Sequence, residues 1–269
     1  LDGGLGDDFL SGGNENDIYI YGLGYGHDTI DDRYQTRVGN GEFDIVRFGE
    51  GISLADITWQ RDAESDHVVA HLTDQDSLTI LNQFNYGGLG TGSFDEIEEY
   101  HFSDGIILTH QELKELILIE GKTDGDDEIY GYYTSDYLDG GLGDDYLNGV
   151  DGNDTYYFDI GYGHDTIHDN LSIVRYSNDD KIFFGSGFTS ENLVLRRDGE
   201  DLNITFTNSS DKITIINQNS RLYFDRIEEF HFSDGTIWDL DYITDLAENI
   251  TGTSGVDHLN GSPIHDKLF

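Results

Sequence analysis

Single apolar residues recur at regular intervals along the middle of the chain. Ile129, Leu138, Leu147 and Tyr156 stand nine residues apart, each at the centre of a short triplet between polar hexamers. Because the middle side chain of a short strand points opposite to its neighbours, all four are predicted to face inward. Two nonapeptides then make one coil of 18 residues with turns on alternate edges. Each hexamer is therefore predicted to stack on the hexamer two repeats later.

Beyond these triplets the pattern changes to longer stretches in which apolar and polar residues alternate. Such stretches, with turns that contain Gly, Asp or Ser between them, predict strands. Thr109 is an N-cap residue for a helix at 110–119, with Leu113, Leu116 and Ile117 on one face. The strands predicted before this helix are 45–48, 57–60, 68–72, 78–81, 97–102 and 106–108.

The chain repeats itself at long range. LDGGLGDDFL at 1–10 matches LDGGLGDDYL at 138–147, and GYGHDTI occurs at both 24–30 and 161–167. FDEIEEYHFSDG at 94–105 matches FDRIEEFHFSDG at 224–235. The repeats predict two units, 1–121 and 122–248, each made of short-strand repeats followed by longer strands and a helix, and the start of a third unit at 249–269.

An aspartate ends each hexamer, and Asp127, Asp136, Asp145 and Asp154 follow one another at a spacing of nine. Glycines at the first, second and fourth places permit positive φ, so a hexamer can turn its carbonyl oxygens toward one point. The carboxylate completes a cluster of hard oxygens, which suits calcium with its about six to eight ligands and loose geometry better than magnesium. Polar turns between strands are the alternative, since Asp and Gly are common there. Turn preference alone does not explain the strict register.

Stacking of the hexamers pairs their aspartates across coils. Glu15 stands where a glycine is expected in the Asp17 loop, and that loop is expected to bend less easily. Asp28 is expected to end its row. The predicted pairs are Asp127 with Asp145, Asp136 with Asp154, Asp145 with Asp165, Asp154 with Asp180, Asp8 (with Gly4 and Gly6) with Asp28, and Asp17 with Asp44; Asp257 and Asp266 belong to the restarted pattern.

The nonapeptide GGLGDDYLN at 140–148 resembles the calcium-binding repeat of RTX proteins, G-G-x-G-x-D-x-U-x. The longer-strand pattern, T-I-x-N-Q followed by I-E-E-x-H-F-S-D-G, resembles the haemolysin-type calcium-binding-related region of large bacterial exoproteins. The resemblance implies an all-β fold of two tandem right-handed parallel β-rolls, each capped by a β-rich segment and a short α-helix. It also implies several bound Ca²⁺ ions.

The resemblance further implies which atoms bind the ions. One loop offers the carbonyls at places 2 and 4 and its aspartate, and the stacked loop offers places 1 and 3 and its aspartate. The loop at 131–136 is poor in glycine and departs from the pattern. Carried onto this chain, the ligands are Thr123, Gly125 and Asp127 with Gly140, Leu142 and Asp145; Tyr132, Thr134 and Asp136 with Gly149, Asp151 and Asp154; Gly141, Gly143 and Asp145 with Ile160, Tyr162 and Asp165; and Gly152.

The composition narrows the classes of partner. Fifty-five acidic against 14 basic residues leave a net charge of −41, which excludes nucleic acid because phosphate binding needs clustered Lys and Arg. Such charge also opposes compaction unless cations neutralise it. No cysteine is present, which excludes disulfides and thiolate metal sites. No apolar run is long enough to span a membrane. The chain has no Met and begins inside a repeat, so we expect a fragment of a longer protein, monomeric by itself.

The sequence shows no recognisable arrangement of catalytic residues. His67 and His71 would lie ~13 Å apart on a strand, too far to share one ion. Glu98 and Glu99 are neighbours on a strand and point to opposite faces, as do Glu228 and Glu229. No nucleophile elbow, phosphate loop or dinucleotide fingerprint occurs, so an enzyme is not predicted.

We therefore predict a calcium-binding structural module of a secreted bacterial protein of the toxin or adhesin class, which folds on calcium after type I secretion. Two alternatives stay open. One is an adhesin module that binds a cell-surface glycan or receptor through exposed tyrosines, Tyr21, Tyr25 and Tyr86. The other is a non-catalytic accessory part of a polysaccharide-active enzyme.

Overall fold

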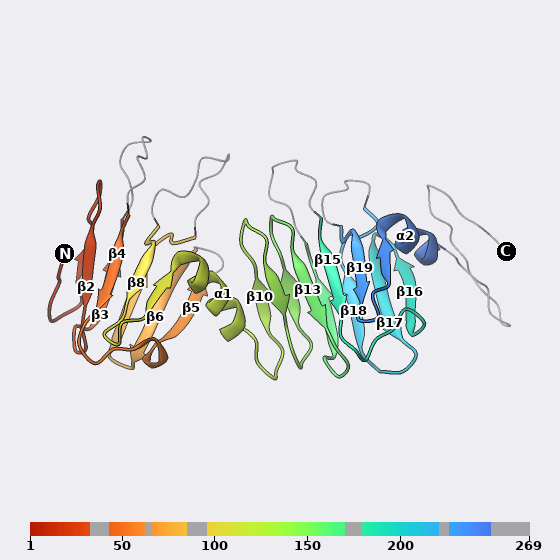
Figure 1. Cartoon of the computed structure of the whole chain (residues 1–269), viewed down its shortest axis with the longest axis horizontal. Helices are drawn as coiled ribbons and strands as arrows, with labels where there is room; N and C mark the ends of the chain where they lie inside the picture. The colour runs from red at the N-terminus through yellow and green to blue at the C-terminus, as the bar shows by residue number, and fades with distance from the viewer. Residues whose placement is uncertain (33–42, 63–65, 85–95, 170–178, 221–225, 249–269) are drawn as a thin grey trace. The chain divides into compact units, whose positions relative to one another are not determined.

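The computed structural model describes residues 1–32, 43–62, 66–84, 96–169, 179–220 and 226–248 (Figure 1). The chain divides into two compact units, unit 1 (Leu1–Glu120) and unit 2 (Gly121–Phe269). The predicted third unit at 249–269 lies outside the described residues. Within the described residues each unit contains two β-sheets and one α-helix, in agreement with the predicted all-β class.

Short parallel strands make up the first part of unit 2, and successive strands fall alternately in its two sheets. One sheet receives β10, β12 and β14, and the other receives β11, β13 and β15. Glu128 pairs with Tyr146 and Tyr137 with Thr155, which is the predicted shift of 18 residues per coil. The strands are β10 (Glu128–Tyr130), β11 (Tyr137–Asp139), β12 (Tyr146–Asn148), β13 (Thr155–Phe158), β14 (His164–Ile167) and β15 (Lys181–Phe184).

Unit 1 begins with a shorter series of the same kind. β1 pairs in parallel with β3, and β2 pairs in parallel with β4. These strands are β1 (Phe9–Leu10), β2 (Ile18–Tyr21), β3 (His27–Ile30) and β4 (Ile45–Phe48). We call the short parallel strands of each unit its roll.

The core of the roll in unit 2 lies between its two sheets. Ile129, Leu138, Leu147 and Tyr156 are all buried, as the nine-residue pattern predicts. Each of the three-residue strands β10, β11 and β12 contributes one buried apolar side chain, whereas the four-residue strands β13 and β15 contribute two each, Tyr156 with Phe158 and Ile182 with Phe184. The roll therefore buries little apolar surface per residue, and the oxygen-rich turns at its edges must hold the coils together by other means.

Longer antiparallel strands cap each roll. In unit 1, β7 continues the parallel pairing by adding to β3, and β6 and β5 then add antiparallel to it. In the other sheet β8 adds in parallel to β4 and β9 turns back on it. Unit 2 repeats this arrangement with β18, β17 and β16 after β14, and β19 and β20 after β15. The cap covers the last coil, whose open edge would otherwise expose unpaired backbone groups.

The cap strands differ from the predicted ranges by a few residues at their ends. A short 3₁₀ helix, η1 (Leu54–Asp56), precedes β5. The strands of unit 1 are β5 (Thr58–Asp62), β6 (His67–Thr73), β7 (Asp76–Ile80), β8 (Glu99–His101) and β9 (Ile107–Thr109), and those of unit 2 are β16 (Leu193–Asp198), β17 (Asp201–Phe206), β18 (Lys212–Ile215), β19 (Glu229–Phe232) and β20 (Ile237–Asp239).

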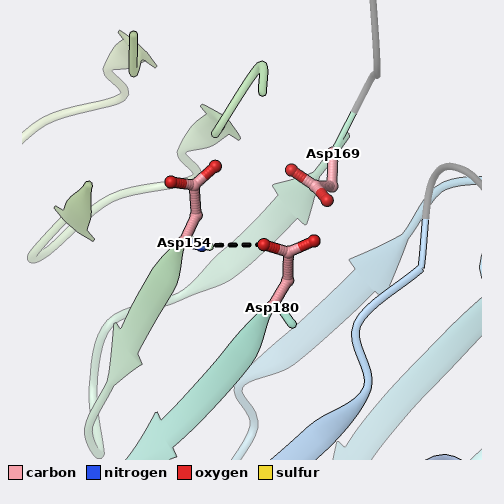
Figure 2. Close-up of side chains that lie close together, drawn as sticks. All are labelled: Asp154, Asp169 and Asp180. Atoms are coloured by element: carbon pink, nitrogen blue, oxygen red, sulfur yellow. Dashed lines mark hydrogen bonds between the residues drawn. The ribbon is translucent and has the colours of Figure 1, made fainter. Parts of the chain in front are cut away.

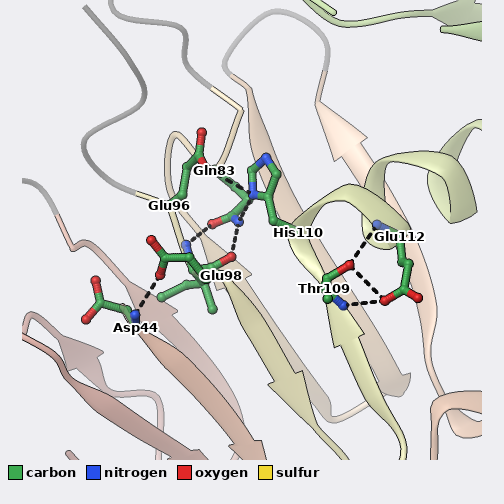
Figure 3. Close-up of polar contacts among 8 residues, drawn as sticks. Asp44, Gln83, Glu96, Glu98, Thr109, His110 and Glu112 are labelled. Atoms are coloured by element: carbon green, nitrogen blue, oxygen red, sulfur yellow. Dashed lines mark hydrogen bonds and ion pairs between the residues drawn. The ribbon is translucent and has the colours of Figure 1, made fainter. Parts of the chain in front are cut away.

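One helix ends each cap, α1 (His110–Glu120) and α2 (Leu240–Glu248). Thr109 caps α1 as predicted: its backbone N–H donates to Glu112, and the Glu112 N–H donates to the Thr109 hydroxyl (Figure 3). The buried face differs from the prediction, since Lys114 and Leu118 are buried with Leu113, while Leu116 and Ile117 are half-buried. Among the described residues no helix is long and apolar enough to cross a membrane.

A buried glutamine joins the two sheets of each cap. The Gln83 side chain accepts the Ile97 N–H at 3.0 Å and donates to the Ile97 carbonyl at 2.9 Å (Figure 3). Gln218 makes the same pair of bonds with Ile227, both at 2.8 Å. This contact places the glutamate that follows, Glu98 or Glu228, beside the last coil of the roll. The repeated N-Q pattern in the sequence therefore has a structural role.

Candidate metal centres

Aspartate carboxylates form a ladder along each edge of the roll in unit 2. In the first-edge row the backbone N–H of Asp127 donates to Asp145 at 2.9 Å, and that of Asp145 donates to Asp165 at 3.1 Å. In the second-edge row Asp136 donates to Asp154 at 2.8 Å, and Asp154 donates to Asp180 at 2.7 Å. Each aspartate thus lies directly against the aspartate of the next coil, which is the arrangement of pairs that the sequence predicts.

Unit 1 has the same ladders with fewer members. The Asp8 N–H donates to the Asp28 carboxylate at 3.0 Å, and the Asp17 N–H donates to Asp44 at 2.7 Å. Both predicted pairs of this unit are therefore in contact.

The cap extends every row by one acidic residue that the sequence analysis missed. Glu228 accepts the Asp180 N–H at 2.9 Å, and Glu98 accepts the Asp44 N–H at 2.6 Å (Figure 3). On the other edge Asp211 accepts the Gly161 N–H at 2.8 Å, and Asp76 accepts the Gly24 and Gly26 N–H groups at 3.0 and 3.1 Å. The expectation that Asp28 ends its row is therefore wrong, because the Asp76 carboxylate binds the Asp28 loop. The signal for all four was their occurrence at matching places of both units.

Glycine is required where a loop curls around its own aspartate and where it meets the loop stacked on it. A Cβ atom at Gly140 would collide with the Asp145 carboxylate, and one at Gly149 would collide with that of Asp154. A Cβ atom at Gly143, whose φ is +132°, would lie 2.5 Å from the Gly125 carbonyl oxygen. The carbonyls of one loop therefore point at the loop stacked on it, as a shared oxygen cluster requires.

The other predicted ligands lie in these same loops. The N–H of Thr123 donates to Asp127 at 2.6 Å, and that of Tyr132 donates to Asp136 at 2.5 Å. The Tyr162 carbonyl accepts the Gly143 N–H at 2.8 Å and keeps one lone pair. The Thr134 carbonyl faces Gly152, and the Thr123 carbonyl faces Gly141. The Tyr25 carbonyl accepts the Gly6 N–H, and both Gly4 and Gly6 have positive φ. The side chains of Leu142 and Ile160 are exposed and that of Asp151 is half-buried, while Asp257 and Asp266 lie outside the described residues.

Glu15 does not straighten its loop. It adopts a φ of +76°, the left-handed conformation in which a glycine was expected, and Val150 of unit 2 also has a φ of +76°. A residue with a side chain pays roughly 1–2 kcal/mol for this conformation, and a β-branched residue is the least suited to it. The contacts between stacked loops therefore impose the turn even where the local sequence resists it.

Several buried carboxylate oxygens in these rows accept no hydrogen bond from the described residues. They are the Oδ2 atoms of Asp8, Asp28, Asp145 and Asp154. A buried ionised oxygen without a partner is strongly unfavourable. Hard, unpaired carboxylate oxygens between glycine-rich loops are the donors that calcium prefers, so the residues present fit that ion.

The crowding of these groups raises their pKa values. Burial raises the pKa of Asp154 to about 9, and the nearby Asp136 and Asp180 carboxylates add to the effect. Burial also raises the pKa of Asp165 to about 7 and that of Asp44 to about 8. Each shift has the same origin, which is that the ionised form lacks water and faces like charge. A cation within the rows would remove that penalty.

The tyrosines proposed as an exposed glycan site do not form one. Tyr21 is 1% exposed, and its hydroxyl donates to the Gly26 carbonyl at 2.6 Å. Its place in β2 alternates inward, which explains the burial. Tyr25 is half-buried against Tyr21, and Tyr86 lies outside the described residues.

Comparison with known proteins identifies the caps. Residues 68–112 and 201–242 each match the model of the haemolysin-type calcium binding protein related domain. The two matched segments correspond to each other, running from the β6–β7 or β17–β18 pair to the start of the helix. The chain therefore matches this domain twice, and each matched segment lies in the cap that closes one roll.

One curated relative and one solved structure resemble longer parts of the chain. A stretch of 127 residues, 47% of the chain, is 36% identical to iron-regulated protein FrpA of Neisseria meningitidis serogroup C and covers 10% of that protein. The chain thus spans a small part of the length of this relative. The crystal structure of extracellular lipase LipA from Serratia marcescens aligns over 79% of this chain and 37% of the lipase chain, with 16% identity and a TM-score of 0.26, which is too low to carry an argument.

Proposed function

We propose that this chain, with its two haemolysin-type calcium binding protein related domains, is a calcium-binding structural module of a secreted bacterial protein. The observation that carries the proposal is the ladder of stacked aspartates, in which buried carboxylate oxygens such as Asp145 Oδ2 accept no hydrogen bond from the described residues. The two segments that match the haemolysin-type calcium binding protein related domain support calcium binding. No catalytic role is proposed for the chain.

The ligand atoms that the stacked loops offer favour calcium over other ions. Each pair of stacked loops offers only oxygens, from carboxylates and from carbonyls such as that of Gly125. Calcium accepts about six to eight such ligands at 2.3–2.6 Å with loose geometry, whereas magnesium retains its waters. Ions between successive coils would form one row along each edge, spaced by the ~4.8 Å between strands.

We further propose that calcium drives folding of the chain after type I secretion. The net charge is −41, and each of the first three strands of the roll in unit 2 supplies only one inward apolar side chain. That burial is small against the ~1–2 kcal/mol per residue that backbone ordering costs. Each ion would remove repulsion between two loops and join them, so that binding free energy becomes folding free energy. A chain that stays unfolded in a low-calcium cytoplasm suits export.

The test is circular dichroism of the intact chain in chelator, then with calcium, and separately with magnesium at the same ionic strength as the control. The expected result is a weak β signal in chelator, a strong one with calcium, and little change with magnesium. A full β signal in chelator would contradict folding on calcium. Equal responses to both ions would show general screening of charge rather than specific sites.

An exposed aromatic surface favours a second candidate function, binding of a glycan or receptor. On the outward face of the β11-β13-β15-β19 sheet, Tyr137 is 54% exposed and stacks on Tyr157, while Phe183 is 40% exposed and stacks on His231 at 4.5 Å. Flat aromatic faces pack well against sugar rings. The matching places in unit 1 hold Ile20, Arg47 and His101.

A glycan array with the intact chain tests this candidate. Retention that is lost in Tyr137→Ala and Phe183→Ala, but kept in Arg47→Ala on the matching face of unit 1, would favour an adhesin module. The same outcome with plant or microbial polysaccharides alone would favour an accessory part of a polysaccharide-active enzyme. No retention by the calcium-loaded wild-type chain would exclude both.

A further inference from the structure

Three aspartates converge where β13, β14 and β15 of unit 2 come together. Asp154 immediately precedes β13, Asp180 immediately precedes β15, and Asp169 follows β14 by two residues (Figure 2). One carboxylate oxygen of each lies within 4.8 Å of the corresponding oxygens of the other two. Their exposed fractions are 0%, 1% and 1% for Asp154, Asp169 and Asp180, respectively. Asp169 is outside every nonapeptide, and the sequence analysis gave it no role.

The surrounding hydrogen bonds leave two of these oxygens unused. Asp154 Oδ1 accepts the Asp136 N–H, Asp180 Oδ1 accepts the Asp154 N–H, and Asp169 Oδ1 accepts the Tyr156 hydroxyl at 3.0 Å. The Oδ2 atoms of Asp154 and Asp169 are buried and accept no hydrogen bond from any described residue. No Lys, Arg or His of the described chain forms an ion pair with the three. Among the described residues no cationic side chain therefore balances their negative charge.

The spacing of the three oxygens fits a single ion of calcium's size. Two ligand atoms bound at about 2.3–2.6 Å to the same ion lie at most about 5 Å apart. The three carboxylate oxygens all lie within 4.8 Å of one another, which meets this condition. A zinc or copper site would use nitrogen or sulfur ligands, and none is present in this trio.

We propose that Asp154, Asp169 and Asp180 bind one divalent cation of calcium's chemistry, at a carboxylate-rich site that differs from the glycine-loop sites by its third carboxylate. The proposal rests on the proposed function in so far as both need a hard cation. This site ties the start of β13, the end of β14 and the start of β15 to one ion. Through the Asp180 N–H, which donates to Glu228, it also connects the roll to its cap.

Tyr156 acts as the positioning residue for Asp169. Its hydroxyl accepts the Gly149 N–H at 2.8 Å and donates to Asp169 Oδ1. The donated bond occupies Oδ1 of Asp169, while Oδ2 is buried and accepts no hydrogen bond from the described residues. A hydrogen-bonded partner of this kind fixes the orientation of a metal ligand.

Unit 1 contains the same pattern of hydrogen bonds around Tyr19 and Asp32. The Tyr19 hydroxyl accepts the Gly12 N–H at 2.7 Å and donates to Asp32 Oδ1 at 2.5 Å. Asp32 Oδ2 is buried and accepts no hydrogen bond from the described residues. Asp17 and Asp44, in contact through the Asp17 N–H, take the places of Asp154 and Asp180. The orienting hydrogen bond from a tyrosine to an aspartate is therefore present in both units.

The direct test is an anomalous difference map from crystals of the intact chain grown with calcium and soaked in terbium. A peak within about 2.3–2.6 Å of the Asp154, Asp169 and Asp180 oxygens is expected. Peaks between glycine loops but none at this trio would overturn the inference and leave the proposed function standing. Peaks nowhere in the map would overturn both.

Counting of bound calcium by native mass spectrometry gives an independent test. Asp169→Asn is expected to bind one calcium fewer per chain than the wild type, whereas Asp179→Asn is expected to bind the wild-type number. Asp179 is the matched control, since it is an exposed carboxylate next to Asp180. An unchanged count in Asp169→Asn would overturn the inference.

Tyr156→Phe decides the matter if Asp169→Asn does not fold, because it keeps the buried ring and removes only the hydroxyl. Calorimetric titration is expected to show one site weakened roughly 10- to 100-fold, the usual effect of losing an orienting hydrogen bond. A purely structural hydroxyl would lower the melting temperature and leave every calcium affinity unchanged, which would contradict the proposal.

Discussion

Unit 1 and unit 2 have matching caps, and the part of the roll that the structure describes has one coil more in unit 2 than in unit 1. In the described residues, two short strands per sheet precede the cap strands of unit 1, and three precede those of unit 2. The first-edge row is Asp8 and Asp28 in unit 1 but Asp127, Asp145 and Asp165 in unit 2. One more coil thus adds one carboxylate to each row, and the cap pairs with the last coil in the same way.

The two caps reach the same packing with different side chains. In unit 1 Trp59 of β5 pairs with the small Ala70 of β6, whereas in unit 2 Leu195 of β16 pairs with Ile204 of β17. A large residue beside a small one fills the same space as two of middle size. Residue identity thus differs at this pair, whereas the acidic residues that extend the rows are of the same type in both units, Glu98 and Glu228 on one edge and Asp76 and Asp211 on the other.

Removal of calcium is the largest perturbation expected. As the calcium concentration falls, the backbone amides of both units should lose protection from hydrogen exchange. The loss should be steeper in unit 2, which has the longer rows of aspartates, because more ions stabilise one folded unit. Hydrogen exchange followed by mass spectrometry across a calcium titration measures the two units in the same chain. Parallel loss in both units would contradict the link between row length and calcium dependence.

Substitution of a carboxylate that two proposed calcium sites share should have the second largest effect on stability. Asp145 contacts both Asp127 and Asp165, whereas Asp127 contacts only Asp145 among the row members. At a calcium concentration 100 times Kd each ion contributes about 2.7 kcal/mol. Asp145→Asn should therefore lower the free energy of unfolding by about 5 kcal/mol and Asp127→Asn by about 2.7 kcal/mol. Equal effects in urea denaturation would contradict the shared-ligand geometry.

Truncation of a buried side chain in the roll should have the third largest effect on stability. Leu147 is fully buried, so Leu147→Ala should destabilise the calcium-loaded chain by roughly 2–5 kcal/mol. Leu142, in the same nonapeptide but 46% exposed, is the matched control, and its change to Ala should stay within about 0.5 kcal/mol. Urea denaturation in excess calcium measures both, and a small effect at Leu147 would show that ions alone hold the coils together.

Relief of backbone strain should have the smallest effect. Glu15 in unit 1 and Val150 in unit 2 both have a φ of +76°, so Glu15→Gly and Val150→Gly should each stabilise the chain by about 1 kcal/mol. Asn14→Gly, in the same loop but without positive φ, should give no gain. Melting temperatures in excess calcium test this, and loss of stability in both glycine variants would show that the side chains contribute packing that outweighs the strain.

The repeat pattern by itself determined the roll of this protein. Inward residues such as Leu138 and Leu147, the shift of one coil between paired strands, and the contacts of Asp127 with Asp145 all follow from a nine-residue period. A strict short period leaves one way to stack turns and strands, because each strand must repeat the geometry of the one before it. The capping of α1 by Thr109 was equally local and equally predictable.

Only the tertiary structure decided where the rows continue and where they gain further carboxylates. Asp169 is distant in sequence from Asp154, yet the return of β14 beside β13 and β15 brings their carboxylates together. Asp211 and Glu228 join the rows through pairings of cap strands that no period encodes. The positive φ of Glu15 has the same origin. Contacts between distant segments set them, and such contacts outweigh the local preferences that a sequence displays.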